Sequence, residues 1–373
     1  MDTKIYIMAH KEFEAPKDEM YVPLQVGSAC AKKLPYLSDD SRDNISVKNP
    51  NYCELTGMYW LWKNEHSCDY IGICHYRRYL INEQGMIFSR HEVEGILSDY
   101  DIITTKLLTL TCSYYHGFGE NHHLRDLQIT GEVVRELYPD YYELFDTMVH
   151  DVHTYFGNIM ITAKPIYDAY CTWLFEILTE VERRVDMTGY NNYNKRLFGF
   201  LSEFLQTVWI RKQGLKVYEC MVGMLGEKYE TRQIRMQLAD YFAQGDYKSA
   251  ESFFLSCYKT RPDILMEASD VTGELHLCMQ VISTASYEQD AYHHCILDKL
   301  RDYSALMHYC HTLNEITNRF LNDMVREEDM QTLKNSTTIT PIAVEISVKM
   351  YCKEEPLIPE ITQKMCQYLN HAQ

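Results

Sequence analysis

The hydrophobic positions of the first 220 residues form short apolar runs that alternate with longer stretches of helical periodicity. The short runs have the length of buried strands and give way abruptly to polar residues; they cover residues 4–9, 69–74, 101–105, 157–162 and 216–220. Helical periodicity covers residues 50–64, 122–148, 165–184 and 195–212. Strands that alternate with helices predict an α/β layered domain with a largely parallel sheet.

Two of these helices carry signals for their ends. Asn49 is a helix-capping residue type and stands directly before Pro50, which suits the first helical position. Apolar residues then recur at the spacing i, i+3, i+4, i+7, namely Leu55, Met58, Tyr59 and Trp62. Gly214 follows the basic end of the apolar stretch 195–212 and predicts its C-terminal cap.

The pattern changes near residue 228. Strand signals fade there, and helical periodicity dominates the rest of the chain. Residues 235–262 resemble one tetratricopeptide-type helical hairpin, but a stack of such repeats needs about three of them. We therefore expect an α/β domain over residues 1–227 and a mainly helical accessory domain over residues 228–373.

Charge and composition exclude several classes of protein. The chain has 36 Lys and Arg against 53 Asp and Glu, a net charge of −17, which opposes sequence-independent binding to nucleic acid. No apolar stretch is long enough to span a bilayer, and the first residues lack the pattern of a signal peptide. The 13 cysteines form no C-x-x-C pair, which favours reduced thiols. We expect a cytoplasmic protein, at most peripheral at the inner face of the cell membrane.

The 30 tyrosines, against 13 phenylalanines, admit two interpretations. A tyrosine has a flat apolar body and a polar tip, which suits surfaces that bind carbohydrate or nucleobases. Half-buried packing is the commoner use of the same side chain.

Polar side chains follow two of the predicted strands. His10 and Lys11 come after the first strand, and His75-Tyr76-Arg77-Arg78 comes after the strand 69–74. Ligands of open α/β sheets collect at the carboxyl ends of strands, and guanidinium groups bind phosphate bidentately. The motif at 75–78 therefore favours an anionic ligand, although both arginines could instead pair with acidic neighbours.

Glu203 is an acidic residue in an otherwise apolar helix, with Gly199 one turn earlier on the same face. A buried carboxyl group there would have a raised pKa and could act as a general base. The alternatives are a polar stripe of the helix, or an ion pair with Arg196 or Arg211.

No motif predicts a metal or a bound dinucleotide. His122-His123 and His150-Asp151-Val152-His153 lack a convincing third ligand, and the Asp99-x-Asp101 triplet precedes its strand rather than following it. Neither a P-loop nor a G-x-G-x-x-G fingerprint occurs.

Several blocks taken together resemble the bacterial capsular and exopolysaccharide glycosyltransferase family that is catalogued as domain of unknown function 4422. The blocks occur in order over about residues 3–226: Ile5–Lys11, Gln25–Gly27, Asp40–Ser46, Lys48–Gly57, Asp69–Tyr79, Gly157–Met160 and Gly199–Glu203. The resemblance implies a Rossmann-like A-type glycosyltransferase fold. It also implies transfer of a sugar from a nucleotide diphosphate donor, which we expect to be UDP-linked, to a hydroxyl of a glycan or lipid-linked oligosaccharide.

The resemblance also assigns roles to individual residues. In related folds an Asp-x-Asp motif that binds a divalent metal follows the strand corresponding to 69–74. His75, Tyr76, Arg77 and Arg78 stand there instead, which implies a metal-independent reaction in which cationic side chains stabilise the diphosphate. Residues expected at the donor are Ala9, His10, Lys11, Asp40, Asp43, Asn44 and Tyr76, and those expected at the sugar or acceptor are Gly157, Asn158 and His153. Catalytic candidates are Glu203, Arg77, Arg78 and His75.

Three questions stay open at the level of sequence. In an inverting reaction Glu203 would take the proton of the acceptor hydroxyl, whereas in a retaining reaction it would orient the donor sugar. The competing class is a nucleotide- or glycan-binding protein that keeps the fold without turnover. The helical region could form a homodimer, dock an assembly partner or brace the first domain.

Overall fold

The computed structural model describes residues 2–224, 229–266, 269–352 and 354–369. Two compact units, Met1–Leu225 and Gly226–Gln373, divide the chain. The domain boundary expected between residues 227 and 228 lies outside the described residues. Each unit has hydrophobic clusters of its own.

The first unit is built on a mixed sheet of eight strands. In chain order they are β1 (Thr3–Ala9), β2 (Tyr21–Gln25), β3 (Leu37–Ser38), β4 (Tyr70–His75), β5 (Arg78–Ile81), β6 (Ile102–Thr105), β9 (Met160–Ala163) and β10 (Val217–Met224). β1 lies between β2 and β4, and β9 inserts between β4 and β6. β10 pairs with both β6 and β5. A separate small sheet joins β7 (Leu108–Thr109) to β8 (His153–Thr154).

Strand direction corrects the expectation of a largely parallel sheet. β1 runs parallel to β2 and β4, β2 runs parallel to β3, and β6 runs parallel to β10. β9, in contrast, is antiparallel to both of its neighbours, and β5 is antiparallel to β10. The expectation was wrong for β9, because a short apolar run indicates burial but carries no information on direction, and β5 was not among the predicted strands.

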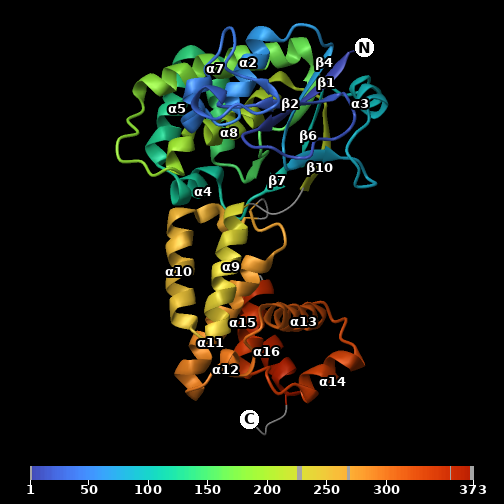
Figure 1. The fold of residues 1–373 in the computed structure, drawn as a ribbon, viewed down its shortest axis with the longest axis vertical. Coiled ribbons are helices and arrows are strands. Elements are labelled where there is room, and N and C mark those ends of the chain that lie inside the picture. Colours follow the sequence, from blue (N-terminus) through green and yellow to red (C-terminus); the bar gives the residue numbers. More distant parts are fainter. Residues whose placement is uncertain (1, 225–228, 267–268, 353, 370–373) are drawn as a thin grey trace. The chain divides into compact units, whose positions relative to one another are not determined.

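Both faces of the sheet are covered (Figure 1). Along β1, Tyr6 and Met8 pack into the cluster formed with the larger helical layer, whereas Ile5 and Ile7 pack with the single helix α3 (Arg90–Leu97). Helices of the larger layer are α2 (Leu55–Asn64), α4 (Tyr114–Asn121), α5 (Leu124–Leu137), α6 (Pro139–Val149), α7 (Lys164–Arg184) and α8 (Leu197–Gln213). Burial on both faces explains why the strand sequences are almost continuously apolar.

Two helices predicted as single segments are divided. The segment 50–64 forms α1 (Asn49–Tyr52) and α2, because Cys53 between them has φ 51° and ψ −131°. The segment 122–148 forms α5 and α6, and Pro139 starts the second of them. Gly214 caps α8 in the left-handed conformation, as its position predicts.

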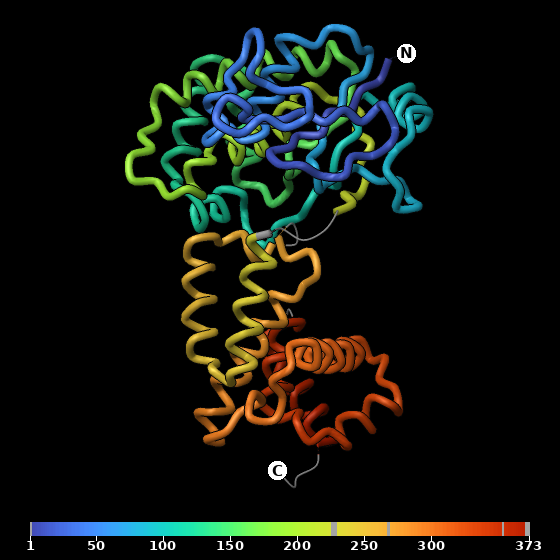
Figure 2. The backbone as a smooth tube through the Cα atoms, in the orientation of Figure 1, coloured from blue at the N-terminus to red at the C-terminus, as the bar shows by residue number. Residues whose placement is uncertain are grey.

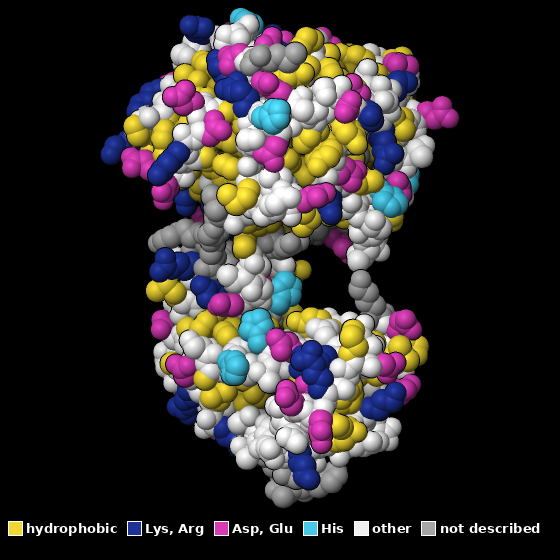
Figure 3. Space-filling model, turned by 90° about the vertical axis from the view of Figure 1, so that its right-hand side faces the viewer, with side chains coloured by type: hydrophobic (Ala, Val, Ile, Leu, Met, Phe, Trp, Pro, Cys, Tyr) yellow, Lys and Arg dark blue, Asp and Glu magenta, His cyan; other side chains and the backbone are white. Residues whose placement is uncertain are grey.

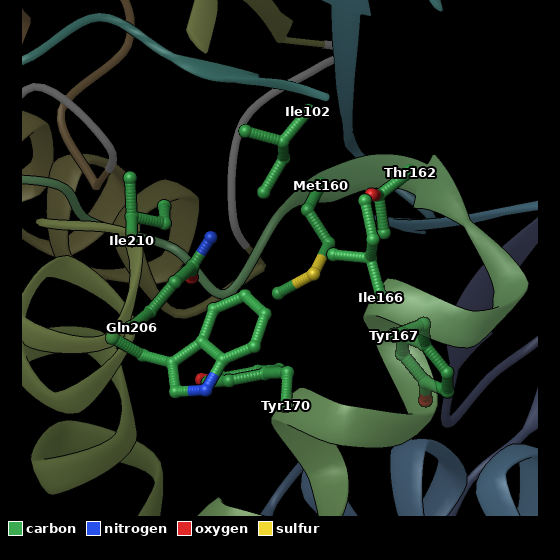
Figure 4. A pocket seen from close by; sticks show the side chains of 9 residues that line it. Ile102, Met160, Thr162, Ile166, Tyr167, Tyr170, Gln206 and Ile210 are labelled. Atoms are coloured by element: carbon green, nitrogen blue, oxygen red, sulfur yellow. The ribbon is translucent and has the colours of Figure 1, made fainter. Parts of the chain in front are cut away.

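Helices α7 and α8 pack tightly against the sheet. Figure 4 shows the side chains of β6, β9, α7 and α8 around a small interior gap, with Met160 and Gln206 extending toward it. The gap has no room for a water molecule. Such dense packing fixes α8, the helix that carries Glu203, against the sheet.

All secondary structure described for the second unit is helical. Its α-helices are α9 (Tyr229–Gln244), α10 (Tyr247–Thr260), α11 (Glu274–Tyr292), α12 (Ile296–Lys299), α13 (Tyr303–Leu321), α14 (Glu327–Asn335), α15 (Pro341–Tyr351) and α16 (Ile358–Cys366). α9 and α10 form a hairpin whose turn contains Gly245 at φ 74°. Short 3-10 turns in the chain are Ser28–Cys30, Ser46–Lys48, Asn194–Arg196, Pro262–Leu265 and Glu355–Leu357.

On the face drawn in Figure 3, acidic and basic side chains are interspersed on each unit. Within the described part of the chain, no helix is long and apolar enough to cross a membrane.

Candidate active site

The motif at residues 75–78 forms a tight hairpin at the end of β4. His75 is the last residue of β4 and pairs directly with Arg78, the first residue of β5. Tyr76 and Arg77 make the turn between them. The sequence pattern predicted that the strand breaks into a loop, so β5 was missed. Because directly paired residues share a face of a sheet, the hairpin places the Arg78 and His75 side chains beside each other.

Gly157 joins His75 to Glu203. Its carbonyl accepts a hydrogen bond from His75 Nε2 at 2.7 Å, and its N–H donates to Glu203 Oε1 at 3.1 Å. A carbonyl only accepts, so Nε2 of His75 carries the proton and Nδ1 is left as an acceptor. Gly157 has φ 101°, a conformation open to glycine and strained for other residues. One backbone unit therefore sets the positions of two catalytic candidates.

The surroundings move the pKa values of these two groups in opposite directions. Burial, together with the nearby Glu54 carboxylate, raises the pKa of Glu203 to about 7, against the lowering effect of Arg78, the Gly157 hydrogen bond and Arg196. Burial lowers the pKa of His75, and the Arg78 charge acts in the same direction. At neutral pH His75 is therefore an uncharged imidazole, while Glu203 exchanges a proton readily.

Asn158 fastens the site to two helices. Its Nδ2 donates to Glu54 Oε1 at 2.6 Å and to the Gly199 carbonyl at 3.2 Å, while Ser202 Oγ donates to its Oδ1 at 3.1 Å. The side chain is fully buried, and the backbone is left-handed at φ 49°. The contact with sugar or acceptor that the family resemblance implies for Asn158 stays a prediction; the contacts it makes here position Glu54.

Glu54, Cys53 and Arg196 complete the site and were not among the predicted site residues. Glu54 begins α2 and lies close enough to act on the pKa of both His75 and Glu203. Arg196 Nε donates to Cys53 Sγ at 3.4 Å, and burial raises the pKa of that thiol to about 11. A Cβ on Gly199 would lie 3.4 Å from Cys53, so Gly199 and Cys53 are neighbours in the site. The sequence did contain one indication of Cys53 and Glu54, because both lie in the block Lys48–Gly57 on which the family resemblance partly rests.

Residues 4–214 match the protein family described as Domain of unknown function (DUF4422). The chain belongs to the DUF4422 family. All residues of the site just described lie within the matched part. Among curated proteins, none matches the chain.

A solved structure also matches the chain. The apo structure of the bifunctional glycosyltransferase WbbM superposes with a TM-score of 0.55 at 31% sequence identity. The alignment covers 61% of this chain and 46% of the WbbM chain, so the DUF4422 chain matches less than half of that protein.

Three residues predicted at the donor lie together at the ends of β1 and β4 in the DUF4422 unit. The His10 ring meets the Tyr76 ring edge-on at 5.1 Å, and Lys11 Nζ lies 5.4 Å from the centre of the same ring. Phe13 adds a tilted contact with Tyr76 at 5.9 Å. Ala9 is buried at the end of β1. His10 and Lys11 are exposed, so this aromatic group is open to a ligand.

The other predicted donor residues lie in the irregular segment that leads from β2 to α1, where they bond to other residues of the chain (Figure 2). Asp40 pairs with Lys33, which lowers the pKa of that carboxyl group. Asp43 accepts from Tyr59 Oη at 3.1 Å, and Asn44 accepts from the Ser46 N–H at 3.2 Å. Their role at the donor stays a prediction.

Asp39, which was not predicted, organises this segment. It is fully buried and accepts from the N–H groups of Gly27 and Ser28 and from Ser46 Oγ, at 2.8, 3.0 and 2.5 Å. The adjacent Asp40 is the same residue type but only partly buried, which is why the sequence pattern could not distinguish the two.

His153 lies on β8, where its Nδ1 bonds Asp151 Oδ1 at 3.1 Å. Its predicted role at the acceptor stays untested by these contacts. Within the described residues, no group of three or more His, Cys, Asp or Glu side chains is arranged to hold a metal ion.

Proposed function

We propose that this chain is a glycosyltransferase that moves a sugar from a nucleotide diphosphate donor to a hydroxyl of a glycan acceptor in the synthesis of a surface polysaccharide. The observation that carries the proposal is the Gly157 bridge, which holds Glu203 and His75 together beside Arg78. The similarity to WbbM supports the same class of reaction.

The donor would lie across the ends of β1 and β4. The aromatic group of His10, Phe13 and Tyr76 suits a nucleobase, and we propose that this base is uracil. Arg77 and Arg78 suit the diphosphate. A divalent metal does not fit the hairpin, because two guanidinium groups repel a cation and donate rather than accept hydrogen bonds. The arginines would supply the positive charge that the leaving diphosphate requires.

Glu203 would act as the general base. The acceptor oxygen attacks the anomeric carbon, its proton passes to a Glu203 carboxylate oxygen, and the bond to the diphosphate breaks with its electron pair on the departing oxygen. A pKa of about 7 matches this task at neutral pH. The base role belongs to an inverting reaction. His75 would hold Gly157, and through it the Glu203 carboxyl group, in place.

Ligand binding tests the donor site. Calorimetric titration of the full chain with UDP, GDP, CDP and dTDP in EDTA is expected to show binding of one nucleotide, with UDP favoured. Arg78→Gln should weaken that binding by about tenfold or more, because each charge-assisted hydrogen bond contributes roughly 1.5–3 kcal/mol.

The matched control is Arg125→Gln on the exposed face of α5, which should bind like the wild type. Binding that appears only with Mn²⁺ or Mg²⁺ would contradict the metal-independent donor site. Absence of binding to every nucleotide under both conditions would contradict the proposed function itself. Binding without any release of nucleotide from sugar donors would instead favour the non-catalytic alternative.

A further inference from the structure

Helix α8 is buried along most of its length but is partly exposed at one place. From Leu197 to Ile210 every residue of this helix is buried except Phe200 and Glu203. These two are three residues apart and lie on the same face of the helix. The aromatic ring of Phe200 therefore borders the side of the site on which Glu203 is accessible.

Other rings gather around Phe200. The His122 ring lies 4.3 Å from the Phe200 ring, and the Tyr193 ring lies 5.0 Å from it. His122 and Tyr193 are nearly parallel, with 13° between their planes. The Arg196 guanidinium group lies 5.3 Å from the centre of the Phe200 ring and also donates a hydrogen bond to Cys53 Sγ. The cluster is thus continuous with the candidate active site.

A second ring pair extends this cluster toward solvent. His123 is exposed and stacks on Tyr190 at 4.0 Å, with 19° between the planes. Asn194 links the two histidines, through contacts with His122 Nδ1 at 3.2 Å and His123 Nε2 at 3.5 Å. We call the rings of His122, His123, Tyr190 and Phe200, together with the buried Tyr193 ring behind them, the ring surface.

We propose that the ring surface binds a sugar ring of the acceptor glycan next to Glu203. This inference rests on the proposed function and names the acceptor side of the same site. Flat aromatic faces pack against the apolar C–H faces of a sugar, while ring nitrogens and hydroxyl groups bond its hydroxyls. The position of the ring surface favours the acceptor rather than the donor as its ligand. The ring surface adjoins Glu203, the base that takes the acceptor proton, whereas the donor diphosphate would lie at the hairpin of β4 and β5.

Saturation-transfer NMR with simple sugars tests this inference. The probes are the methyl glycosides of glucose, galactose, mannose and rhamnose, each added to the full-length protein with UDP present. At least one should receive saturation from the wild type. Phe200→Leu keeps an apolar side chain but removes the ring, and should weaken binding of that glycoside by roughly three- to tenfold. Phe200→Tyr should restore it.

Phe253→Leu makes the same change at a half-buried phenylalanine in the helical unit and serves as the control. His123→Ala tests the exposed part of the ring surface without altering α8. Melting temperatures are measured for every variant, so that loss of fold is separated from loss of binding.

The outcomes separate the two proposals. Unchanged sugar binding in Phe200→Leu and His123→Ala overturns the ring surface as the acceptor subsite. Binding of UDP with no glycoside bound by the wild type also overturns the subsite but leaves the donor site standing. Failure of both UDP and every glycoside to bind overturns the proposed function as well.

Discussion

Replacing Glu203 by glutamine should remove activity and, at the same time, stabilise the first unit in a pH-dependent way. The pKa of Glu203 lies at about 7 in the folded protein, against 4.5 for an exposed glutamate. A tenfold change in a proton equilibrium corresponds to 1.36 kcal/mol, so the ionised carboxylate lowers the free energy of unfolding by about 3 kcal/mol above pH 7. Glutamine has no charge to bury and can still accept the hydrogen bond from Gly157.

The sign follows from proton linkage. Because the folded-state pKa is raised, the folded protein binds the Glu203 proton more tightly than the unfolded chain does. Stability from this group is therefore complete below pH 4.5 and is lost as the pH rises through 7. The free energy of unfolding of Glu203→Gln should equal that of the wild type near pH 4.5. The variant should become the more stable protein between pH 4.5 and 7, and its free energy of unfolding should be higher by up to about 3 kcal/mol at pH 8.

Urea unfolding followed by tryptophan fluorescence measures this difference in the first unit alone. All four tryptophans lie there: Trp60, Trp62, Trp173 and Trp209. Glu143→Gln on the exposed surface of α6 is the matched control and should show no pH-dependent gain. Equal or lower stability of Glu203→Gln at pH 8 would refute a buried carboxylate with a raised pKa. Turnover of the wild type should also fall below pH 7, where Glu203 becomes protonated.

Three further substitutions test the framework around the site, and urea unfolding with the same fluorescence signal measures each. Asn158→Ala removes the three hydrogen bonds of this buried side chain, with Glu54, Gly199 and Ser202, and should cost about 2–4 kcal/mol; a loss under 1 kcal/mol would contradict the role given to Asn158. Gly157→Ala forces a side chain into φ 101° and should cost roughly 1–3 kcal/mol, with a larger loss of turnover than of stability. Asp39→Ala removes three hydrogen bonds and should cost about 2–4 kcal/mol, whereas Asp40→Ala, which removes an ion pair with the exposed Lys33, should cost under about 1 kcal/mol.

Much of the first unit follows from its sequence because burial and periodicity are local properties. The strands near residues 4–9, 69–74, 101–105 and 216–220 occur as predicted, and the helices occur with changed ends. The interruption of the helix at Cys53 could not be predicted from the sequence, because the residues on both sides are helical and a cysteine gives no turn signal. The direction of β9 depends on the path of the chain through α5 and α6, which no local pattern records.

The candidate site shows the same division. Arginines after a strand and a lone carboxyl group in an apolar helix could be identified, and the structure brings Arg78, His75 and Glu203 together. Their catalytic roles stay predictions. Glu54 could not be identified, because its partner Asn158 lies far along the chain. Asp39 could not be identified, because nothing in the sequence shows that the loop around Gly27 and Ser46 folds onto it.

Release of nucleoside diphosphate from a sugar donor tests the central claim most directly. The full chain is incubated with UDP-, GDP-, CDP- and dTDP-linked sugars in EDTA, with and without a bacterial glycan extract as acceptor, and the nucleotide product is quantified. We predict release from one donor class that the extract accelerates and that falls by about 100-fold or more in Glu203→Gln but not in Glu143→Gln. The account is contradicted if folded wild-type protein releases no nucleotide from any donor, or if Glu203→Gln works as fast as the wild type.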